Sequence, residues 1–217
     1  MESIIQYILN NQTDLLVLTW EHIKLVGLAI IIAIVIGVPT GIYLSTNKSL
    51  AEVVLQICAI IMTIPSIALF GLMIPILSLI NQGIGFLPAL IALILYSQLP
   101  IIRNTYVAIT NVDPNMRDAA KGIGMSTFQR LRQVEIPIAL PVIMAGVRTA
   151  VVLSIGIGAI AAFIGAGGLG VLIDQGISRS NRDMIIVGAV AVSILSIIAD
   201  TVLGLLQRFL TPKGMQS

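Results

Sequence analysis

Long apolar runs with almost no charge limit how this chain can fold more than any other feature. Residues 25–38, for example, read LVGLAIIIAIVIGV. A helix needs about 20 mostly apolar residues to cross a hydrocarbon core of about 30 Å. We expect five such spans, at about residues 23–44, 53–77, 86–105, 138–164 and 184–206. A membrane β-barrel would need short segments that alternate between polar and apolar residues, and these runs do not alternate.

Composition supports the same conclusion. Of the 217 residues, 57% are hydrophobic and 10% are charged, whereas soluble domains carry about 25% charged residues. So few charges cannot cover the surface of a soluble domain of this length. The sequence therefore predicts an all-α, polytopic membrane protein that forms a single transmembrane domain over residues 1–217, and we draw no inference of nucleic-acid binding from the net charge of +2.

The distribution of basic residues predicts the orientation, because loops rich in Lys and Arg stay on the cytoplasmic side. Basic residues follow the first, third and fifth spans: Lys48, Arg103, Arg117, Lys121, Arg130, Arg132, Arg208 and Lys213. The loop at residues 81–83 is uncharged, and the charges of Arg179 and Arg182 are offset by nearby aspartates. We expect the N-terminus outside and the C-terminus in the cytoplasm.

One polar segment interrupts the apolar pattern, and its residues 111–141 read NVDPNMRDAAKGIGMSTFQRLRQVEIPIALP. Asp113 followed by Pro114 is typical of a helix start, and the glycines at 122 and 124 favour its end. Ser126 with a glutamine three residues later indicates a capping box that opens a second short helix, which we expect Pro137 to stop. The sequence predicts a compact, two-helix cytoplasmic element at about residues 113–137.

This segment resembles the cytoplasmic signature of permeases from binding-protein-dependent ABC importers, which reads E-A-A, three residues, G, nine residues, then I-x-L-P. The corresponding positions keep every spacing, with Asp for Glu, Val for Ile and Ile for Leu. The resemblance implies that these residues couple the permease to an ATPase: Asp118, Ala119, Ala120, Gly124, Val134, Ile136 and Pro137.

Two further stretches resemble one branch of that family. Residues 163–170, FIGAGGLG, look like the glycine-rich loop after the fourth span of methionine and osmoprotectant permeases. Together with residues 63–71, TIPSIALFG, they look most like importers of glycine betaine, carnitine and choline. The resemblance implies a methionine-permease-like fold and an extracytoplasmic turn or gate at Gly165, Gly167, Gly168 and Gly170.

The resemblance also implies partners in a bacterial cell membrane. These are two cytoplasmic ABC ATPase subunits, a second permease subunit that is a related chain or a second copy, and an extracytoplasmic substrate-binding protein. The sequence has no G-x-x-x-x-G-K-[ST] motif, so we expect ATP and Mg²⁺ to bind to the partner ATPase and no cofactor to bind to this chain.

Other polar residues favour structural roles over chemistry. The glycines at 165, 167 and 170 also spell G-x-G-x-x-G, but an apolar helix precedes them where a dinucleotide site requires a strand. Arg148 lies roughly 16 Å past Pro137 along a helix, so it is expected in the bundle interior or on a pathway, as are Pro65 and Ser66. Asp200 is a candidate partner for a basic group. His22, next to Trp20, is expected to anchor the chain at the membrane interface.

We find no metal-ligand spacing and no catalytic constellation in the sequence, so no enzyme activity is expected. Two alternatives stay open. One is a permease for methionine or another small solute, because the assignment to a branch rests on short apolar phrases. The other is a membrane structural or assembly protein without a transport path, in which the polar segment would be a solvated loop.

Overall fold

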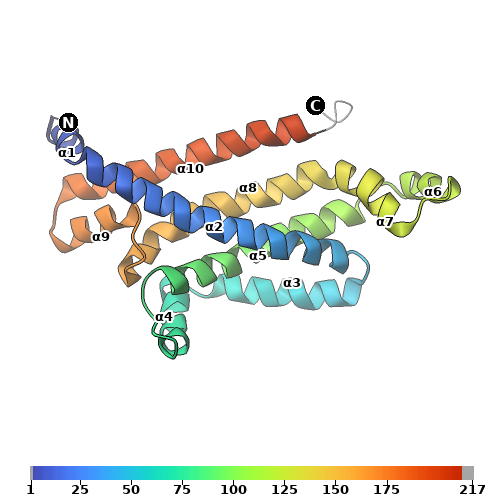
Figure 1. Cartoon of the computed structure of the whole chain (residues 1–217), viewed down its shortest axis with the longest axis horizontal. Coiled ribbons are helices and arrows are strands. Elements are labelled where there is room, and N and C mark those ends of the chain that lie inside the picture. Colours follow the sequence, from blue (N-terminus) through green and yellow to red (C-terminus); the bar gives the residue numbers. More distant parts are fainter. Residues whose placement is uncertain (1, 212–217) are drawn as a thin grey trace.

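The chain folds into an elongated bundle of helices, described here from a computed structural model for residues 2–211 (Figure 1). No strand occurs within those residues, so the all-α prediction is confirmed. The α-helices are α1 (Glu2–Asn10), α2 (Gln12–Leu44), α3 (Lys48–Thr63), α4 (Ser66–Ser78), α5 (Phe86–Thr110), α6 (Pro114–Gly122), α7 (Thr127–Arg130), α8 (Ile136–Ile160), α9 (Gly170–Ser178) and α10 (Arg182–Leu210). A π-helical turn (Leu131–Glu135) precedes α8, and a 3₁₀ turn (Ala161–Ile164) follows it.

Helix α5 forms the centre of the bundle. In its most apolar stretch 67% of the residues are buried, the largest share among the four longest apolar helices. Two glycines let neighbouring helices approach it closely. A Cβ atom on Gly41 of α2 would lie 2.6 Å from the Cβ of Thr105, and one on Gly146 of α8 would lie 2.6 Å from the Cβ of Asn104. Real Cβ atoms do not approach so closely, so both crossings depend on glycine.

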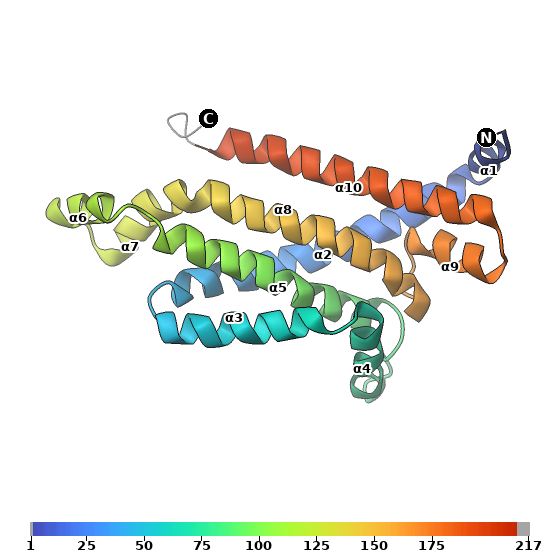
Figure 2. The same cartoon turned by 180° about the vertical axis from the view of Figure 1, so that it is seen from behind.

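The expected spans are present as helices, with one important difference. Four helices are each long and apolar enough to cross a membrane: α2, α5, α10, and the continuous helix that contains α8. The second expected span is divided into α3 and α4, which are bent by 100° at their junction. It becomes a fifth crossing only if the bent pair acts as one span, and Figure 2 shows α4 turning away from the bundle.

Proline explains this bend. Pro65 has no backbone N–H to continue a helix, and Ile64 before it adopts an extended conformation (φ −69°, ψ 127°), as residues before proline usually do. The Ile64 carbonyl that loses its helical partner accepts a hydrogen bond of 2.5 Å from the Tyr96 hydroxyl of α5. The bend is therefore held in place by the core helix.

The prediction that Pro137 stops a helix was wrong. The chain runs as one helical segment from Thr127 to Ile164, and Pro137 lies in the first turn of α8, directly after the π-helical turn. Pro137 has no N–H to donate to the preceding turn, and the π-helical turn directly before it accommodates the change in the hydrogen-bond register. The second half of the polar segment, from Thr127 onward, is thus continuous with the apolar helix α8.

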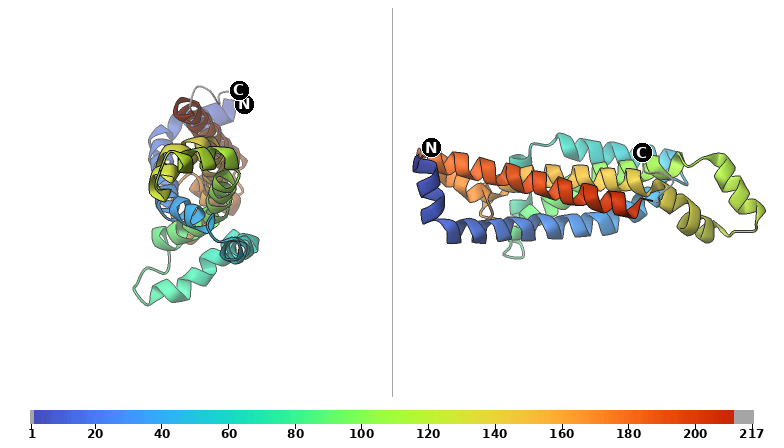
Figure 3. Two further views of the ribbon diagram at one scale, coloured as in Figure 1. Left: turned by 90° about the vertical axis from the view of Figure 1, so that its right-hand side faces the viewer. Right: turned by 90° about the horizontal axis from the view of Figure 1, so that it is seen from above.

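The two ends of the bundle differ in structure. Helices α6 and α7 extend beyond the rest of the bundle at one end, and α1 and α9 lie at the opposite end (Figure 3). Neither α1 nor α9 was predicted, because each has only nine residues and lies next to a much stronger apolar signal.

Candidate functional site

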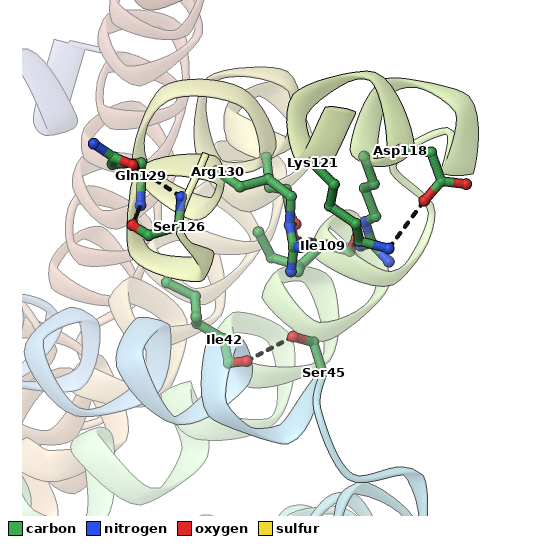
Figure 4. A network of polar contacts seen from close by, with 10 residues as sticks. Ile42, Ser45, Ile109, Asp118, Lys121, Ser126, Gln129 and Arg130 are labelled. Carbon is green, nitrogen blue, oxygen red and sulfur yellow. Dashed lines mark hydrogen bonds and ion pairs between the residues drawn. The ribbon is translucent and has the colours of Figure 1, made fainter. Parts of the chain in front are cut away.

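The polar segment is built by the helix signals that the sequence contains. The Asp113 carboxylate accepts a hydrogen bond of 2.8 Å from the backbone N–H of Asn115, at the start of α6. Ser126 and Gln129 form the predicted capping box, in which each side chain bonds the other residue's backbone N–H (Figure 4). Between the two helices, Gly124 has φ +81°, a left-handed conformation that glycine adopts at little cost.

A buried carboxylate joins the parts of this segment. Glu135, in the π-helical turn, is only 4% exposed. It pairs with Arg130 of α7 at 2.7 Å (Nε to Oε1) and with Arg117 of α6 at 3.5 Å (Nη2 to Oε2). Arg117 also donates a hydrogen bond to the carbonyl of Ile109 in α5. Glu135 and its two arginines therefore connect α6, α7 and the end of the core helix.

Sequence reasoning missed Glu135, which occupies the variable position of the I-x-L-P signature. A carboxylate in a segment that also carries Arg117 and Arg130 was the available signal. Its partners could not be identified, however, because a π-helical turn changes which residues share a face.

The signature residues lie in three environments. Asp118, Ala119 and Gly124 are exposed, Ala120 is 5% exposed, and Val134, Ile136 and Pro137 are half-buried. The Asp118 carboxylate pairs with Lys121 at 2.9 Å, and both side chains remain largely in solvent (Figure 4). Large apolar side chains are exposed beside them, with Met116 at 47%, Ile123 at 75% and Phe128 at 70%. This end of the molecule thus presents a mixed apolar and charged surface on a rigid support.

The glycine-rich loop between α8 and α9 is a tight turn at the opposite end. Gly165, Gly167 and Gly168 have φ between +76° and +81°, where other residues are strained. Gly170, at the start of α9, is required for a different reason, because a Cβ atom there would lie 1.8 Å from the carbonyl oxygen of Ala159.

Glu21 and His22, in the third turn of α2, lie against this loop. The Gly168 N–H donates a hydrogen bond of 3.0 Å to the Glu21 carboxylate. His22 is fully buried, with its Nε2 3.1 Å from the carbonyl oxygen of Ile155. The expectation that His22 is an interfacial anchor was therefore wrong, because the side chain packs inside the bundle, whereas Trp20 is 67% exposed.

Arg148 of α8 is joined to α10 by a polar cluster. Its Nε and Nη2 atoms each donate a hydrogen bond of 2.9 Å to one oxygen of Asp200, and its Nη1 atom donates one of 3.0 Å to the Gln207 side chain. Gln207 in turn donates a hydrogen bond of 2.9 Å to the carbonyl of Pro141. Gly204 lies against the guanidinium group, since a Cβ atom there would be 3.3 Å from its Cζ.

This cluster is only partly covered by the chain. The side chain of Arg148 is 31% exposed and that of Asp200 is 42% exposed. Pro65 and Ser66, by contrast, lie at the bend between α3 and α4, where Pro65 is exposed and Ser66 is half-buried. Residues 2–211 contain no group of three His, Cys, Asp or Glu side chains placed to hold a metal ion.

Comparisons with known proteins agree with this architecture. Residues 29–214 match the family described as the inner membrane component of binding-protein-dependent transport systems. The chain belongs to this family. It is 55% identical to the osmoprotectant import permease protein OsmW of Salmonella typhimurium strain LT2, over 98% of this chain and 99% of that protein. It is 44% identical to the choline transport system permease protein OpuBB of Bacillus subtilis strain 168, over 100% of this chain and 97% of that protein.

A solved structure supports the fold assignment. The chain is similar to a chain of the MetNI methionine ABC transporter in an inward-facing conformation, with a TM-score of 0.81 and 25% sequence identity. The alignment covers 91% of this chain and 96% of that one. The methionine-permease-like fold expected from the glycine-rich loop is therefore confirmed, and the protein is a membrane component of an ABC importer.

Proposed function

We propose that this chain is the permease subunit of an ATP-driven importer for glycine betaine, carnitine, choline or a related osmoprotectant in a bacterial cell membrane. The identity of 55% to an osmoprotectant import permease, over nearly the whole of both chains, carries this proposal. Relatives named for choline and for glycine betaine, carnitine and choline transport also align over the full length of this chain.

The α6–α7 end is proposed to face the cytoplasm and to bind an ABC ATPase. The exposed residues around Asp118, Ala119 and Gly124 offer a surface on which a soluble partner can bind, and the Glu135 cluster keeps that surface in a fixed orientation. Movement of the ATPase would pass into α8 without a flexible joint, because helix is continuous from Thr127 to Ile164. ATP and Mg²⁺ would bind to the two ATPase subunits. The N-terminus would then lie outside and the C-terminus in the cytoplasm.

A second permease subunit is supported by the Arg148–Asp200 pair. Ionisable groups within membrane helices avoid lipid and face other helices or water. The pair lies well within α8 and α10, yet both side chains remain partly exposed in the single chain. A second permease, with a water-filled path between the two, would give this face a suitable environment. The glycine-rich loop, at the proposed outer end, would act as a gate near the docked substrate-binding protein.

An uptake assay tests the substrate assignment. The permease is reconstituted into proteoliposomes with its native ATPase, receptor and companion permease, and uptake of radiolabelled glycine betaine, carnitine, choline and methionine is measured with ATP inside the vesicles. ATP-dependent uptake of one of the first three supports the proposal. Uptake of methionine alone would transfer the assignment to the methionine branch, and no ATP-dependent uptake of any solute would contradict the transport function.

Replacement of Gly124 tests the coupling surface. A Cβ atom at Gly124 meets open space in the chain, so Gly124→Val affects mainly the left-handed turn and any partner seated there. We expect at least a tenfold loss of ATP-coupled uptake with normal membrane insertion. Gly124→Asn, which tolerates the left-handed conformation, is expected to retain more uptake. Gly27→Val, at another open glycine position on α2, serves as the control. Intact uptake in Gly124→Val would count against a coupling role.

A further inference from the structure

A cleft of about 420 Å³ lies at the end of the molecule opposite α6 and α7. Its walls come from α1, from the start of α2, from α9 and from the beginning of α10. Leu172 and Met184, which are 4% and 5% exposed, contribute apolar lining. Tyr7, Asp14, Gln175 and Arg179 contribute polar groups. A concave site of a few hundred Å³ with apolar surface and a few polar groups suits a small ligand.

The two charged groups of this cleft have opposite signs and are not paired with each other. Asp14 belongs to α2 and Arg179 follows the end of α9, and both are exposed. None of the ion pairs between described residues includes either of them. The cleft therefore offers separate positions for an anionic and a cationic group.

The Tyr7 side chain is close enough to both charges to be affected by them. Burial, and in addition the Asp14 carboxylate, raise the pKa of the Tyr7 hydroxyl above its ordinary value, while Arg179 lowers it. The phenol is therefore neutral at physiological pH. A neutral aromatic ring next to a carboxylate is a favourable environment for an ammonium group.

We propose that this cleft binds a small zwitterion, in which an ammonium or alkylated ammonium is joined by a short linker to a carboxylate or phosphate. The anionic group would pair with Arg179, and the cation would lie by Asp14 and the Tyr7 ring. A simple cation would be repelled by Arg179 and a simple anion by Asp14, whereas a zwitterion satisfies both.

Two sources can supply this chemistry. One is a free solute such as glycine betaine, a choice that rests on the proposed function. The other is the head group of a zwitterionic lipid. Ile5 and Leu9 of α1, the helix that contributes Tyr7 to the cleft, are 58% and 60% exposed, and exposed apolar side chains on a short helix are suited to the lipid interface.

Binding measurements test the site and separate the two sources. The permease is purified with its ATPase subunits and without the receptor, in nanodiscs, and binding of radiolabelled glycine betaine is measured at equilibrium. Phosphatidylethanolamine retained by the detergent-purified complex is counted by native mass spectrometry. The test variant is Asp14→Asn/Arg179→Gln. The matched control is Asp174→Asn/Arg182→Gln, which makes the same charge changes at the same end on residues outside the cleft lining.

A loss of glycine betaine binding by about tenfold or more in the test variant alone assigns the cleft to the free solute. A loss of retained phosphatidylethanolamine in that variant alone assigns it to a lipid head group. If neither ligand is affected, or if the control loses as much as the test variant, the proposal is overturned. If the wild-type complex fails to import any osmoprotectant, the proposed function fails, but the lipid measurement still tests the cleft.

Choline provides a readout that a merely structural role of Arg179 would not change. It carries the ammonium group without the anion, so removal of the repelling cation in Arg179→Gln is expected to strengthen choline binding while glycine betaine binding weakens. Equal weakening of both ligands would show that Arg179 only maintains the fold of this end, and would contradict the proposed charge recognition.

Discussion

Two ion-pair clusters lie on the same continuous helix, and they differ in how completely the chain surrounds them. Glu135 is 4% exposed and is paired with two arginines of its own chain. Arg148, thirteen residues further along the sequence, is paired with Asp200, yet their side chains are 31% and 42% exposed. The first cluster lies at a polar end of the bundle, and the second lies between two helices that are apolar enough to cross a membrane.

This difference indicates what each cluster stabilises. The Glu135 carboxylate is paired with two arginines of its own chain, so it stabilises the polar segment, residues 113–137, whether or not a partner is bound. The Arg148 cluster joins α8 to α10, but α10 has only 11% of its apolar stretch buried. A partly exposed ion pair on such a helix needs protein or water on its open side. The first cluster is therefore enclosed by the chain itself, whereas the second is left open on one side, as the proposed contact with a second permease subunit requires.

Removal of the Glu135 carboxylate is expected to have the largest effect. Glu135→Ala leaves two arginines without their shared partner, and loss of one member of a buried ion pair costs on the order of 3 kcal/mol. Amide hydrogen exchange in residues 114–135 of the nanodisc-embedded protein should accelerate by about 100-fold. Glu52→Gln, which changes an exposed carboxylate on α3, should leave this exchange unchanged. Slow exchange in Glu135→Ala would mean that capping alone holds the segment.

Asp200→Asn is expected to lower the amount of assembled complex by about tenfold, because Arg148 then lacks a counter-ion in the membrane. The double variant Arg148→Met/Asp200→Leu removes both charges and should restore most of the assembly, since an apolar pair can replace an ion pair at little cost. Co-purification with the proposed second permease subunit measures the yield. A double variant as poorly assembled as Asp200→Asn would mean that the charges themselves contribute to the interface or to the pathway.

Much of this architecture follows from local sequence signals. The apolar lengths of residues 23–44 and 184–206 lie within α2 and α10, and the capping box at Ser126 forms as its spacing predicts. Such features depend on residues within a few positions of each other, so a single sequence contains the information. The fold class and the start of each of the two short helices in the polar segment were predictable for the same reason.

The remaining features depend on contacts between distant parts of the chain. The bend at Pro65 is held by Tyr96, 31 positions later in the sequence. Burial of His22 depends on the carbonyl of Ile155. Asp200 was a candidate for pairing with a basic group, but the sequence could not identify Arg148 as its partner, because the angular positions of residues on α8 and α10 depend on packing.

Gln207 tests how far the Arg148 cluster depends on hydrogen bonds besides the ion pair. Gln207→Leu removes one bond to Arg148 and one to the Pro141 carbonyl. A hydrogen bond contributes about 1 kcal/mol net, so the effect on thermal unfolding of the assembled complex should be smaller than that of Asp200→Asn. Thr201→Val, on the exposed face of the same helix, is the control. A loss as large as that of Asp200→Asn would show that Gln207, through Pro141, is the main link between the helices.

The smallest effect on stability is expected at Lys121. Its ion pair with Asp118 is 2.9 Å long, but the two side chains are 58% and 71% exposed, and exposed pairs of this kind contribute at most about 1 kcal/mol. Lys121→Gln should leave hydrogen exchange in residues 114–135 as slow as in the wild type, in contrast to Glu135→Ala. If ATP-coupled uptake nevertheless falls, the loss must arise outside the fold of this chain, which would support the proposed ATPase-binding surface. Rapid exchange in Lys121→Gln would contradict the distinction between a buried cluster that maintains the segment and an exposed pair that is available to a partner.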